Sequence, residues 1–358
     1  EKSLQERDQS SFLGARPFMA RFGTDVDVFI EELRLVSQLE GPFQYTVGVY
    51  YESLESDTNE DVAFALTDQA LADRLTLLND FFPGFGPNPF GPNTRQAVDN
   101  THSTSTDQLS FYGELSYAFT EQWELTLGAR RFDYEKDTSR IVLPTLFGVA
   151  GTTLGHTEED GTSYKANLSY TPNDDTLFYA LYSEGFRLGG TNNPIDPTSC
   201  DVDNDGILDG AGVPIAEGFD SDTIDNFELG AKLTLLDNRL QVNAAVFRMD
   251  WDGIPLFATP IVALPGQPER ICFQGLTVNA GEAQSQGLEI EATYQLSENL
   301  QISLGGAFIE AELTKTTQLG NDGDRLPSSP ETSANVGFNY DSDMGGNVFY
   351  IAGDYAYV

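Results

Sequence analysis

Apolar side chains occupy every second position in twelve segments of the chain, with small or polar side chains between them. An alternation of period two is typical of β-strands that have one apolar and one polar face. The clearest segments run over residues 43–51, 109–119, 123–129, 164–170, 227–235, 240–246, 288–296, 300–304 and 334–340. Weaker segments lie near residues 26–37, 176–186 and 347–358. The pattern predicts an all-β fold of about 12 antiparallel strands.

The connections between these segments alternate between short and long. The short ones are rich in Pro, Asn, Asp, Gly and Ser, which favour tight turns, and lie at residues 38–42, 120–122, 172–175, 236–238, 297–299 and 341–346. The long ones lie near residues 52–107, 135–161, 187–222, 252–276 and 314–332. Because antiparallel strands place the two kinds of connection at opposite ends, the sequence predicts a transmembrane β-barrel. Its short turns would be periplasmic and its long loops extracellular.

A soluble β-sandwich or propeller is the structural alternative, because any strand with one buried face alternates in this way. Strand length argues against it. Several segments run to ten or more residues, which matches the roughly 9–11 residues that cross a bilayer at a tilt, whereas strands average about 5–6 residues in general. Phe119 and Trp123 flank one short turn, where the aromatic girdle of a membrane barrel would lie. These observations favour the membrane barrel.

One segment departs from the alternation. Between Asn59 and Asn79 the apolar residues follow a helical spacing, which predicts a helix within a long loop. Four aromatic residues come directly after it: Phe81, Phe82, Phe85 and Phe90. They form a patch that either contacts a ligand or packs the loop against its neighbours.

The charge of the chain is strongly negative. Its 358 residues include 19 Lys and Arg against 56 Asp and Glu, which gives a formal net charge of −37 at pH 7. Nucleic acid is therefore excluded as a partner, because phosphate binding needs clustered basic side chains. No run reaches the roughly 18 apolar residues of a membrane-spanning helix, so helical spans are excluded as well.

The two cysteines, Cys200 and Cys272, both lie in polar stretches rich in Gly and Pro. A single disulfide bond between two loops is the interpretation we favour, and it would place the loops in an oxidising compartment. Two unpaired thiols are the alternative.

Four stretches of the chain carry a recognisable order of motifs. They are Tyr182–Gly190, Phe227–Lys232 with Asn238–Leu240, Asn279–Ala283 with Gly287–Glu289, and Arg325–Pro327 with Pro330 and Ala334–Asn335. Taken together they cover about residues 105–358, and the chain resembles the barrel of the TonB-dependent outer-membrane receptors.

This resemblance implies a barrel of about 22 strands in the outer membrane of a Gram-negative bacterium. Nothing before Asp25 resembles the plug domain of the family, and residues 354–358 lie inside an expected strand. We therefore expect residues 1–358 to be a partial barrel domain that lacks the plug and the last strands. The partners it implies are membrane lipid and lipopolysaccharide, a TonB complex acting through the plug, and a scarce solute. Ferric siderophores are the first candidates for that solute, followed by cobalamin and saccharides.

Two other functions are kept as alternatives, namely a passive porin-like channel and a secreted soluble β-rich protein that binds glycans. An enzyme is not expected. The only histidines, His102 and His156, lie in stretches predicted to be polar loops, and no H-E-x-x-H, G-x-S-x-G or phosphate-loop motif occurs.

An acidic stretch in the long connection 187–222 fits the opening D-x-D-x-D-G of a calcium loop. Its carboxylates belong to Asp201, Asp203, Asp205 and Asp209. Position twelve is Gly212 rather than the bidentate Glu of an EF-hand, so a solvated acidic loop is the alternative to weak Ca²⁺ binding. No other cofactor is expected.

Charged residues between the apolar positions are expected to line the lumen, where they would keep it hydrated or contact the plug. They are Glu114, Arg130, Lys165, Glu184, Glu228, Lys232, Glu289 and Glu291. The resemblance places the ligand between the loops and the upper wall of the barrel. Arg187 and the aromatic patch Phe81, Phe82, Phe85 and Phe90 are therefore the candidate ligand-binding residues.

Overall fold

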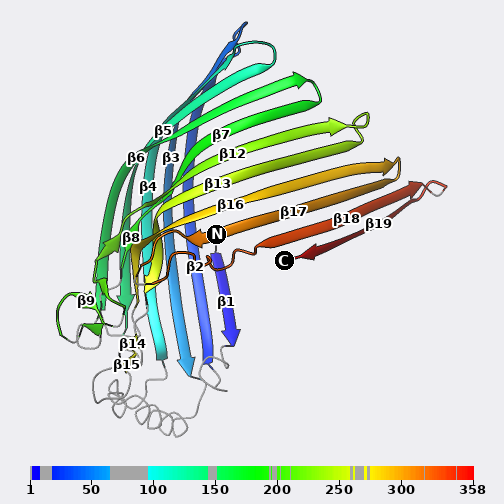
Figure 1. Ribbon diagram of the computed structural model, residues 1–358. Helices are drawn as coiled ribbons and strands as arrows, with labels where there is room; N and C mark the ends of the chain where they lie inside the picture. Colours follow the sequence, from blue (N-terminus) through cyan, green and yellow to red (C-terminus); the bar gives the residue numbers. More distant parts are fainter. Residues whose placement is uncertain are drawn as a thin grey trace.

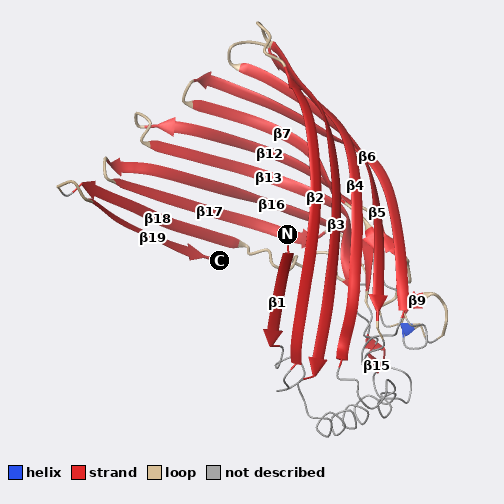
Figure 2. Ribbon diagram, turned by 180° about the vertical axis from the view of Figure 1, so that it is seen from behind, coloured by secondary structure: helices blue, strands red, loops and turns tan. Residues whose placement is uncertain are grey.

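The computed structural model describes residues 2–8, 18–64, 96–143, 151–192, 195, 200–201, 203–209, 211–258, 261–262, 270–271, 275–317, 319–343 and 345–358. Most of them belong to one antiparallel sheet of thirteen strands, which is curved and open in both ribbon views (Figures 1 and 2). The strands follow chain order from one edge to the other: β1 (Lys2–Asp8), β2 (Phe18–Val36), β3 (Phe43–Phe64), β4 (Gln96–Ala118), β5 (Trp123–Val142), β6 (Gly151–Asn173), β7 (Thr176–Arg187), β12 (Asp222–Leu235), β13 (Leu240–Ala258), β16 (Leu276–Ser297), β17 (Leu300–Leu313), β18 (Thr332–Asp343) and β19 (Val348–Tyr357).

Three short strand pairs lie outside this sheet, all within long connections. They are β8 (Gly190–Thr191) with β11 (Gly218–Phe219), β9 (Ile207–Leu208) with β10 (Val213–Pro214), and β14 (Ile261–Val262) with β15 (Arg270–Ile271). No helix of sufficient length and apolar character to cross a membrane occurs among the described residues.

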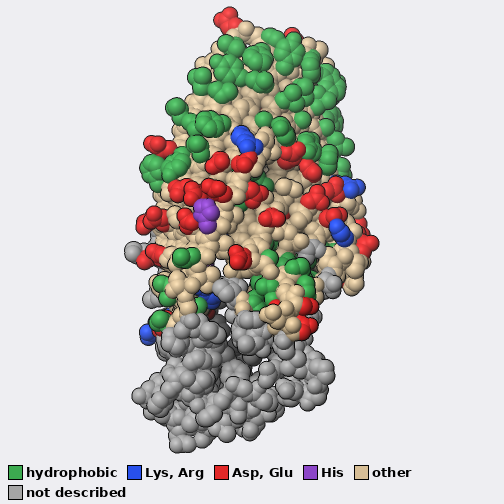
Figure 3. All heavy atoms as spheres, turned by 90° about the vertical axis from the view of Figure 1, so that its left-hand side faces the viewer, with side chains coloured by type: hydrophobic (Ala, Val, Ile, Leu, Met, Phe, Trp, Pro, Cys, Tyr) green, Lys and Arg blue, Asp and Glu red, His purple; other side chains and the backbone are tan. Residues whose placement is uncertain are grey.

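The register of the sheet puts the apolar positions of neighbouring strands side by side. Leu127 lies opposite Leu115, and Leu304 lies opposite Val336. These side chains remain about half exposed, with 49% of Leu127 and 52% of Leu304 accessible, so no second protein layer covers them. Figure 3 shows hydrophobic side chains gathered toward one end of this surface. We call this surface the outer face, its hydrophobic part the apolar band, and the opposite surface of the sheet the inner face.

The short connections agree with the prediction. β12 and β13, for example, are joined through Leu236, Asp237 and Asn238, whose φ angles of 57°, 54° and 64° lie in the left-handed region. Asn and Asp tolerate this conformation well, which explains their use in the turn.

The strands are longer than the alternation predicted. Seven of them, β2–β6, β13 and β16, have 19–23 residues, about twice the roughly 9–11 residues of a tilted membrane strand. The predicted loops 52–107 and 135–161 are therefore wrong in large part, because β3 continues to Phe64 and β6 begins at Gly151. Beyond the apolar band both faces of a strand are polar. The alternation disappears there while the ladder of backbone hydrogen bonds continues.

The prediction of about 12 antiparallel strands is confirmed, since the sheet has thirteen, including β1, which pairs with β2 through Lys2–Asp8. One further prediction needs correction. The helix predicted from Asn59 to Asn79 is wrong at its start, because Asn59 belongs to β3, which ends at Phe64. The rest of that segment, together with Phe81, Phe82, Phe85 and Phe90, lies outside the described residues.

The two faces of the sheet should tolerate charge very differently. Replacing Leu304, which lies in the apolar band of the outer face, by Arg is expected to lower the free energy of unfolding by about 2–4 kcal/mol. Thr293 occupies the inner face of the neighbouring strand, opposite Ser303, and Thr293→Arg should have a much smaller effect. Denaturant unfolding of both variants in lipid bilayers measures the difference, and equal losses would contradict the assignment of the two faces.

Candidate functional site

Polar side chains cross four strands in rows on the inner face, beyond the level of the apolar band. One row consists of Thr58 on β3, His102 on β4, Arg140 on β5 and Thr153 on β6, each opposite the next. A cavity of about 270 Å³ opens over this row. Its lining residues are Thr58, Glu60, Asn100, His102, Thr138, Arg140, Thr153, Thr191 and Asn192. We call it the inner-wall cavity.

Four of the nine residues that line the inner-wall cavity are hydrogen-bonded to one another. The hydroxyl oxygens of Thr138 and Thr191 lie 2.8 Å apart. The Asn100 amide donates a hydrogen bond to Glu60 Oε2 over 3.2 Å. These contacts give the cavity a wall of fixed hydroxyl and amide groups, which suits a polar ligand.

Two cations at this wall lack an acidic partner. Arg140 lines the cavity, and Lys136 lies on the same face of β5, four residues before it. Neither is joined by an ion pair to any acidic residue of the described part of the chain. Six other basic residues do have such a partner: Arg131–Asp160, Lys165–Glu114, Arg187–Asp222, Arg248–Asp250, Lys315–Glu282 and Arg325–Glu331. Arg34, Arg130 and Lys232 on the inner face likewise form no ion pair with a described acidic residue, so Lys136 and Arg140 differ from them in lying beyond the apolar band.

Burial and neighbouring charges shift the pKa values of two basic groups at this wall. Burial lowers the pKa of Lys136. Burial also lowers the pKa of His102, and the positive charges of Arg140 and Lys136 lower it further, so the imidazole is neutral at pH 7. The cavity lining holds one carboxylate, Glu60, which accepts a hydrogen bond from Asn100 and forms no ion pair with Arg140.

These residues were not predicted from the alternation of apolar and polar positions. His102, Lys136 and Arg140 fall in predicted long loops, because their surroundings no longer alternate between apolar and polar residues. A usable signal is present in the runs of Ser and Thr around them, residues 101–106 and 138–139, because Thr favours strands and Ser is tolerated on polar ones.

The segment between β7 and β12 is anchored to the inner face through a buried tyrosine. The Tyr134 hydroxyl accepts a hydrogen bond from the backbone N–H of Gly189 over 3.1 Å and donates one to Glu159 Oε2 over 2.9 Å. Only 1% of Tyr134 is exposed. Ser221, at the other end of the segment, donates to Glu159 Oε1. Both ends of the segment are thereby fixed beside the inner-wall cavity.

Arg187, the predicted ligand-binding residue, lies where this segment leaves β7. Its Nε and Nη2 donate to Asp222, the latter over 2.6 Å, and its guanidinium lies 4.6 Å from the ring centre of Trp251. Trp251 Nε1 also donates to Asp222, which is only 3% exposed. Asp222 thus holds the Arg187 guanidinium over the Trp251 ring, while just over half of the Arg187 side chain stays exposed to solvent.

The register places seven of the eight predicted lumen residues on the inner face. They are Glu114, Arg130, Lys165, Glu228, Lys232, Glu289 and Glu291. The prediction for Glu184 is wrong, because Glu184 shares the outer face with Tyr182 and lies opposite Asp225. The Tyr182 hydroxyl lies 2.6 Å from Glu184 Oε1 and 2.8 Å from Asp225 Oδ1. The polar end of the outer face begins here, above the apolar band.

The acidic loop brings three of its four predicted ligands together. One carboxylate oxygen from each of Asp201, Asp203 and Asp205 lies within 4.8 Å of the others, and Asp209 is not part of this group. The Asp201 carboxylate accepts hydrogen bonds from the backbone N–H groups of Asp205 and Gly206, over 3.0 and 3.2 Å.

A small apolar core lies beneath the acidic loop. It is formed by Cys200, Leu208, Val213, Ala258 and Leu276, all fully or nearly buried. Cys200 is disulfide-bonded. Cys272 lies outside the described residues, and its pairing with Cys200 stays a prediction.

The class of outer-membrane β-barrels is defined by three features that this structure shares. They are an antiparallel sheet in chain order, an exposed apolar band on one face, and short turns opposite long loops. Comparison with family models identifies the group within this class. Residues 6–358 match the model described as TonB dependent receptor-like, beta-barrel. The chain belongs to the β-barrel family of the TonB-dependent receptors, whose members are outer-membrane proteins of Gram-negative bacteria. The resemblance derived from the sequence is thereby confirmed, and the family consists of receptors rather than enzymes.

Individual relatives support this assignment. The metal-pseudopaline receptor CntO of Pseudomonas aeruginosa strain UCBPP-PA14 is 28% identical over 280 residues, which are 74% of this chain and 33% of that receptor. The ferric yersiniabactin uptake receptor FyuA of Yersinia pestis has a similar fold, with a TM-score of 0.65 at 17% identity over 93% of this chain and 42% of its own. The siderophore receptor PiuA of Acinetobacter baumannii gives a TM-score of 0.58 at 20% identity, over 91% of this chain and 45% of its own. The chain therefore spans less than half the length of these relatives.

Removing the Tyr134 hydroxyl should loosen the segment that it holds. In Tyr134→Phe the buried N–H of Gly189 loses its acceptor, which is expected to cost about 1–3 kcal/mol of local stability. Hydrogen exchange at Gly189 should become correspondingly faster, while amides in β17 keep their protection. Unchanged exchange at Gly189 would show that Tyr134 does not anchor the segment.

Proposed function

We propose that this chain forms part of the barrel wall of an outer-membrane receptor that takes up a negatively charged metal chelate. The rest of the receptor would supply the plug and the remaining strands. Two unpaired cations carry the proposal: Arg140, which lines the inner-wall cavity, and Lys136, which lies four residues before it on the same face of β5. A ferric siderophore with free carboxylate or other anionic groups fits such a wall, because hydrogen bonds between charged partners are about twice as strong as neutral ones.

The relatives support a metal chelate as the solute. Their names refer to metal-pseudopaline, to ferric yersiniabactin and to a siderophore. Cobalamin and saccharides are the alternative solutes; the hydroxyl and amide groups of the wall suit a polar ligand of either kind, but neither solute requires two unpaired cations.

Arg187 has a second part in the proposal. Asp222 occupies its Nε and Nη2 groups, so that the remaining edge of the guanidinium is held in a fixed orientation by Asp222 and Trp251. A fixed Arg loses little side-chain entropy on binding an anion. It would extend the binding surface from the inner-wall cavity toward the long loops.

Uptake is proposed to depend on energy supplied through a TonB complex, in contrast to a passive porin-like channel. The two functions differ in a measurable way. Uptake of the ferric chelate into whole cells that carry the full-length receptor should stop when the proton gradient is dissipated. Uptake that continues at the same rate would favour the passive channel.

Loss of the unpaired cations should weaken binding of an anionic chelate. Lys136→Gln and Arg140→Gln should each reduce affinity by about 10-fold to 100-fold, as expected for a charged hydrogen bond of ~1.5–3 kcal/mol. Arg131→Gln is the matched control, because Arg131 lies on the outer face of the same strand in an ion pair with Asp160. Binding to the purified full-length receptor, measured with chelates of negative and of zero net charge, gives the affinities. Equal losses for both chelates, or a loss in the control, would contradict the proposal.

Membrane lipid and lipopolysaccharide are the proposed partners of the outer face. The apolar band matches hydrocarbon, and acidic side chains follow it toward the long loops (Figure 3). Lipopolysaccharide also carries negative charge, so contact at this level requires cations between the two surfaces.

Calcium is proposed as a ligand of the acidic loop, through Asp201, Asp203 and Asp205. Millimolar Ca²⁺ should give a heat of binding in calorimetry with the full-length receptor, in the range of weak extracellular sites. Asp203→Asn with Asp205→Asn should abolish it, while Asp322→Asn in the connection between β17 and β18 should not. Absence of any heat with the unaltered receptor would remove the calcium site.

A further inference from the structure

Acidic side chains face one another across neighbouring strands on the outer face, beyond the apolar band. Figure 3 shows this region as a zone of acidic residues next to the hydrophobic end. Directly opposed pairs are Asp25–Asp57, Asp27–Glu55, Asp107–Glu135, Asp133–Asp160 and Glu135–Glu158. Like charges in directly opposed positions destabilise a sheet. A bound cation would relieve this repulsion.

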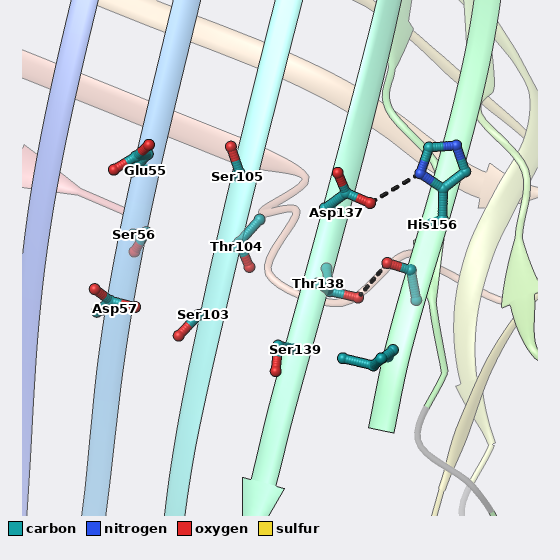
Figure 4. A pocket seen from close by; sticks show the side chains of 12 residues that line it. Glu55, Ser56, Asp57, Ser103, Thr104, Ser105, Asp137, Thr138, Ser139 and His156 are labelled. Atoms are coloured by element: carbon teal, nitrogen blue, oxygen red, sulfur yellow. Dashed lines mark hydrogen bonds and ion pairs between the residues drawn. The ribbon is translucent and has the colours of Figure 1, made fainter. Parts of the chain in front are cut away.

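One histidine lies within this zone. His156 on β6 lies opposite Asp137 on β5, and His156 Nδ1 is 2.8 Å from Asp137 Oδ1. Glu135, two residues before Asp137 on the same face, brings its Oε1 to 3.9 Å from the same nitrogen. One potential ligand atom from each of the three residues lies within 4.8 Å of the others. Figure 4 shows Asp137 and His156 pointing toward each other from adjacent strands.

We propose that Glu135, Asp137 and His156 form a binding site for a divalent first-row transition-metal ion of the Zn²⁺ type. This site lies on the outer face and is separate from the uptake function proposed above. One imidazole nitrogen and two carboxylate oxygens form a ligand set that suits Zn²⁺ and its neighbours. Ca²⁺ and Mg²⁺ prefer oxygen ligands alone, which distinguishes this site from the acidic loop.

The surroundings leave room for the ion and its water ligands. A groove of about 550 Å³ runs across β3–β6 at this level, and His156 and Asp137 are among its lining residues. The small side chains Ser103, Ser105 and Ser139 also line it. More than half of each proposed ligand side chain is exposed, so an ion reaches the site from solvent without a change in the fold.

The competing ligand is a proton. A hydrogen bond to Asp137, together with the negative charges of Asp137, Glu135 and Glu158, raises the pKa of His156. A protonated His156 contributes one positive charge, whereas a divalent ion contributes two at the point where Glu135 faces Glu158. Metal binding displaces this proton.

Copper serves as a spectroscopic probe for this site, and zinc as the calorimetric one. The full-length receptor and its His156→Gln variant are treated with a chelator and then titrated with Cu²⁺, and the difference between their electron paramagnetic resonance spectra should show coupling to a single imidazole nitrogen. His102→Gln, which deletes the only other histidine of residues 1–358, should leave that signal intact. Asp137→Asn is a second test that keeps the imidazole. Since loss of a supporting group already costs about 10–100-fold in metal affinity, each of His156→Gln and Asp137→Asn should weaken Zn²⁺ binding at least about tenfold.

Two results would overturn the site. In the first, the unaltered receptor shows no nitrogen-coordinated Cu²⁺ and binds no Zn²⁺ up to millimolar concentration, which leaves only an ion pair between His156 and Asp137. In the second, His156→Gln and Asp137→Asn bind Zn²⁺ as tightly as the unaltered receptor. Both variants change exposed side chains, so they are expected to fold.

Discussion

The ladder of backbone hydrogen bonds between neighbouring strands is the constraint on which the rest of the structure depends. In hydrocarbon every N–H and C=O group needs a partner within the protein, so strands cross a membrane only as part of a continuous hydrogen-bonded wall. The order β1-β2-β3-β4-β5-β6-β7-β12-β13-β16-β17-β18-β19 provides such a wall. The ladder also fixes which residues share a face. The apolar band, the inner-wall cavity and the acidic zone of the outer face are all consequences of one register.

The sequence analysis predicted the membrane part of the wall well, because alternation exists where one face meets hydrocarbon and the other meets water. Strand identity, the short turns and the face of residues such as Glu289 follow from that contrast. The strand prediction failed where both faces of a strand are polar and exposed to water. There β3, β5 and β6 continue without alternation, so Lys136 and Arg140 were assigned to loops. Glu184 was misplaced for a related reason, since it lies at the upper end of the apolar band, where polar residues first appear on the outer face.

Charge is distributed unequally between the two faces of the sheet in the part that lies beyond the apolar band. The outer face carries opposed carboxylates such as Glu135 and Glu158, while the inner face holds two cations without an acidic partner among the described residues. Under the proposed function, an anionic solute would be repelled by the outer face, whereas the inner face would offer it two cations that no described carboxylate pairs with.

The orientation of the outer face toward lipid is tested most directly by spin labels placed one at a time along β17, from Ile302 to Gly306, in the receptor embedded in an outer-membrane lipid bilayer. Molecular oxygen concentrates in hydrocarbon, so relaxation by oxygen should rise and fall with a period of two. It should be high at positions 302, 304 and 306, whose side chains share the face of Val336 and Phe338, and low at 303 and 305. If oxygen reached neither set of positions, the apolar face would be packed against protein, and the assignment as a membrane barrel wall would be wrong.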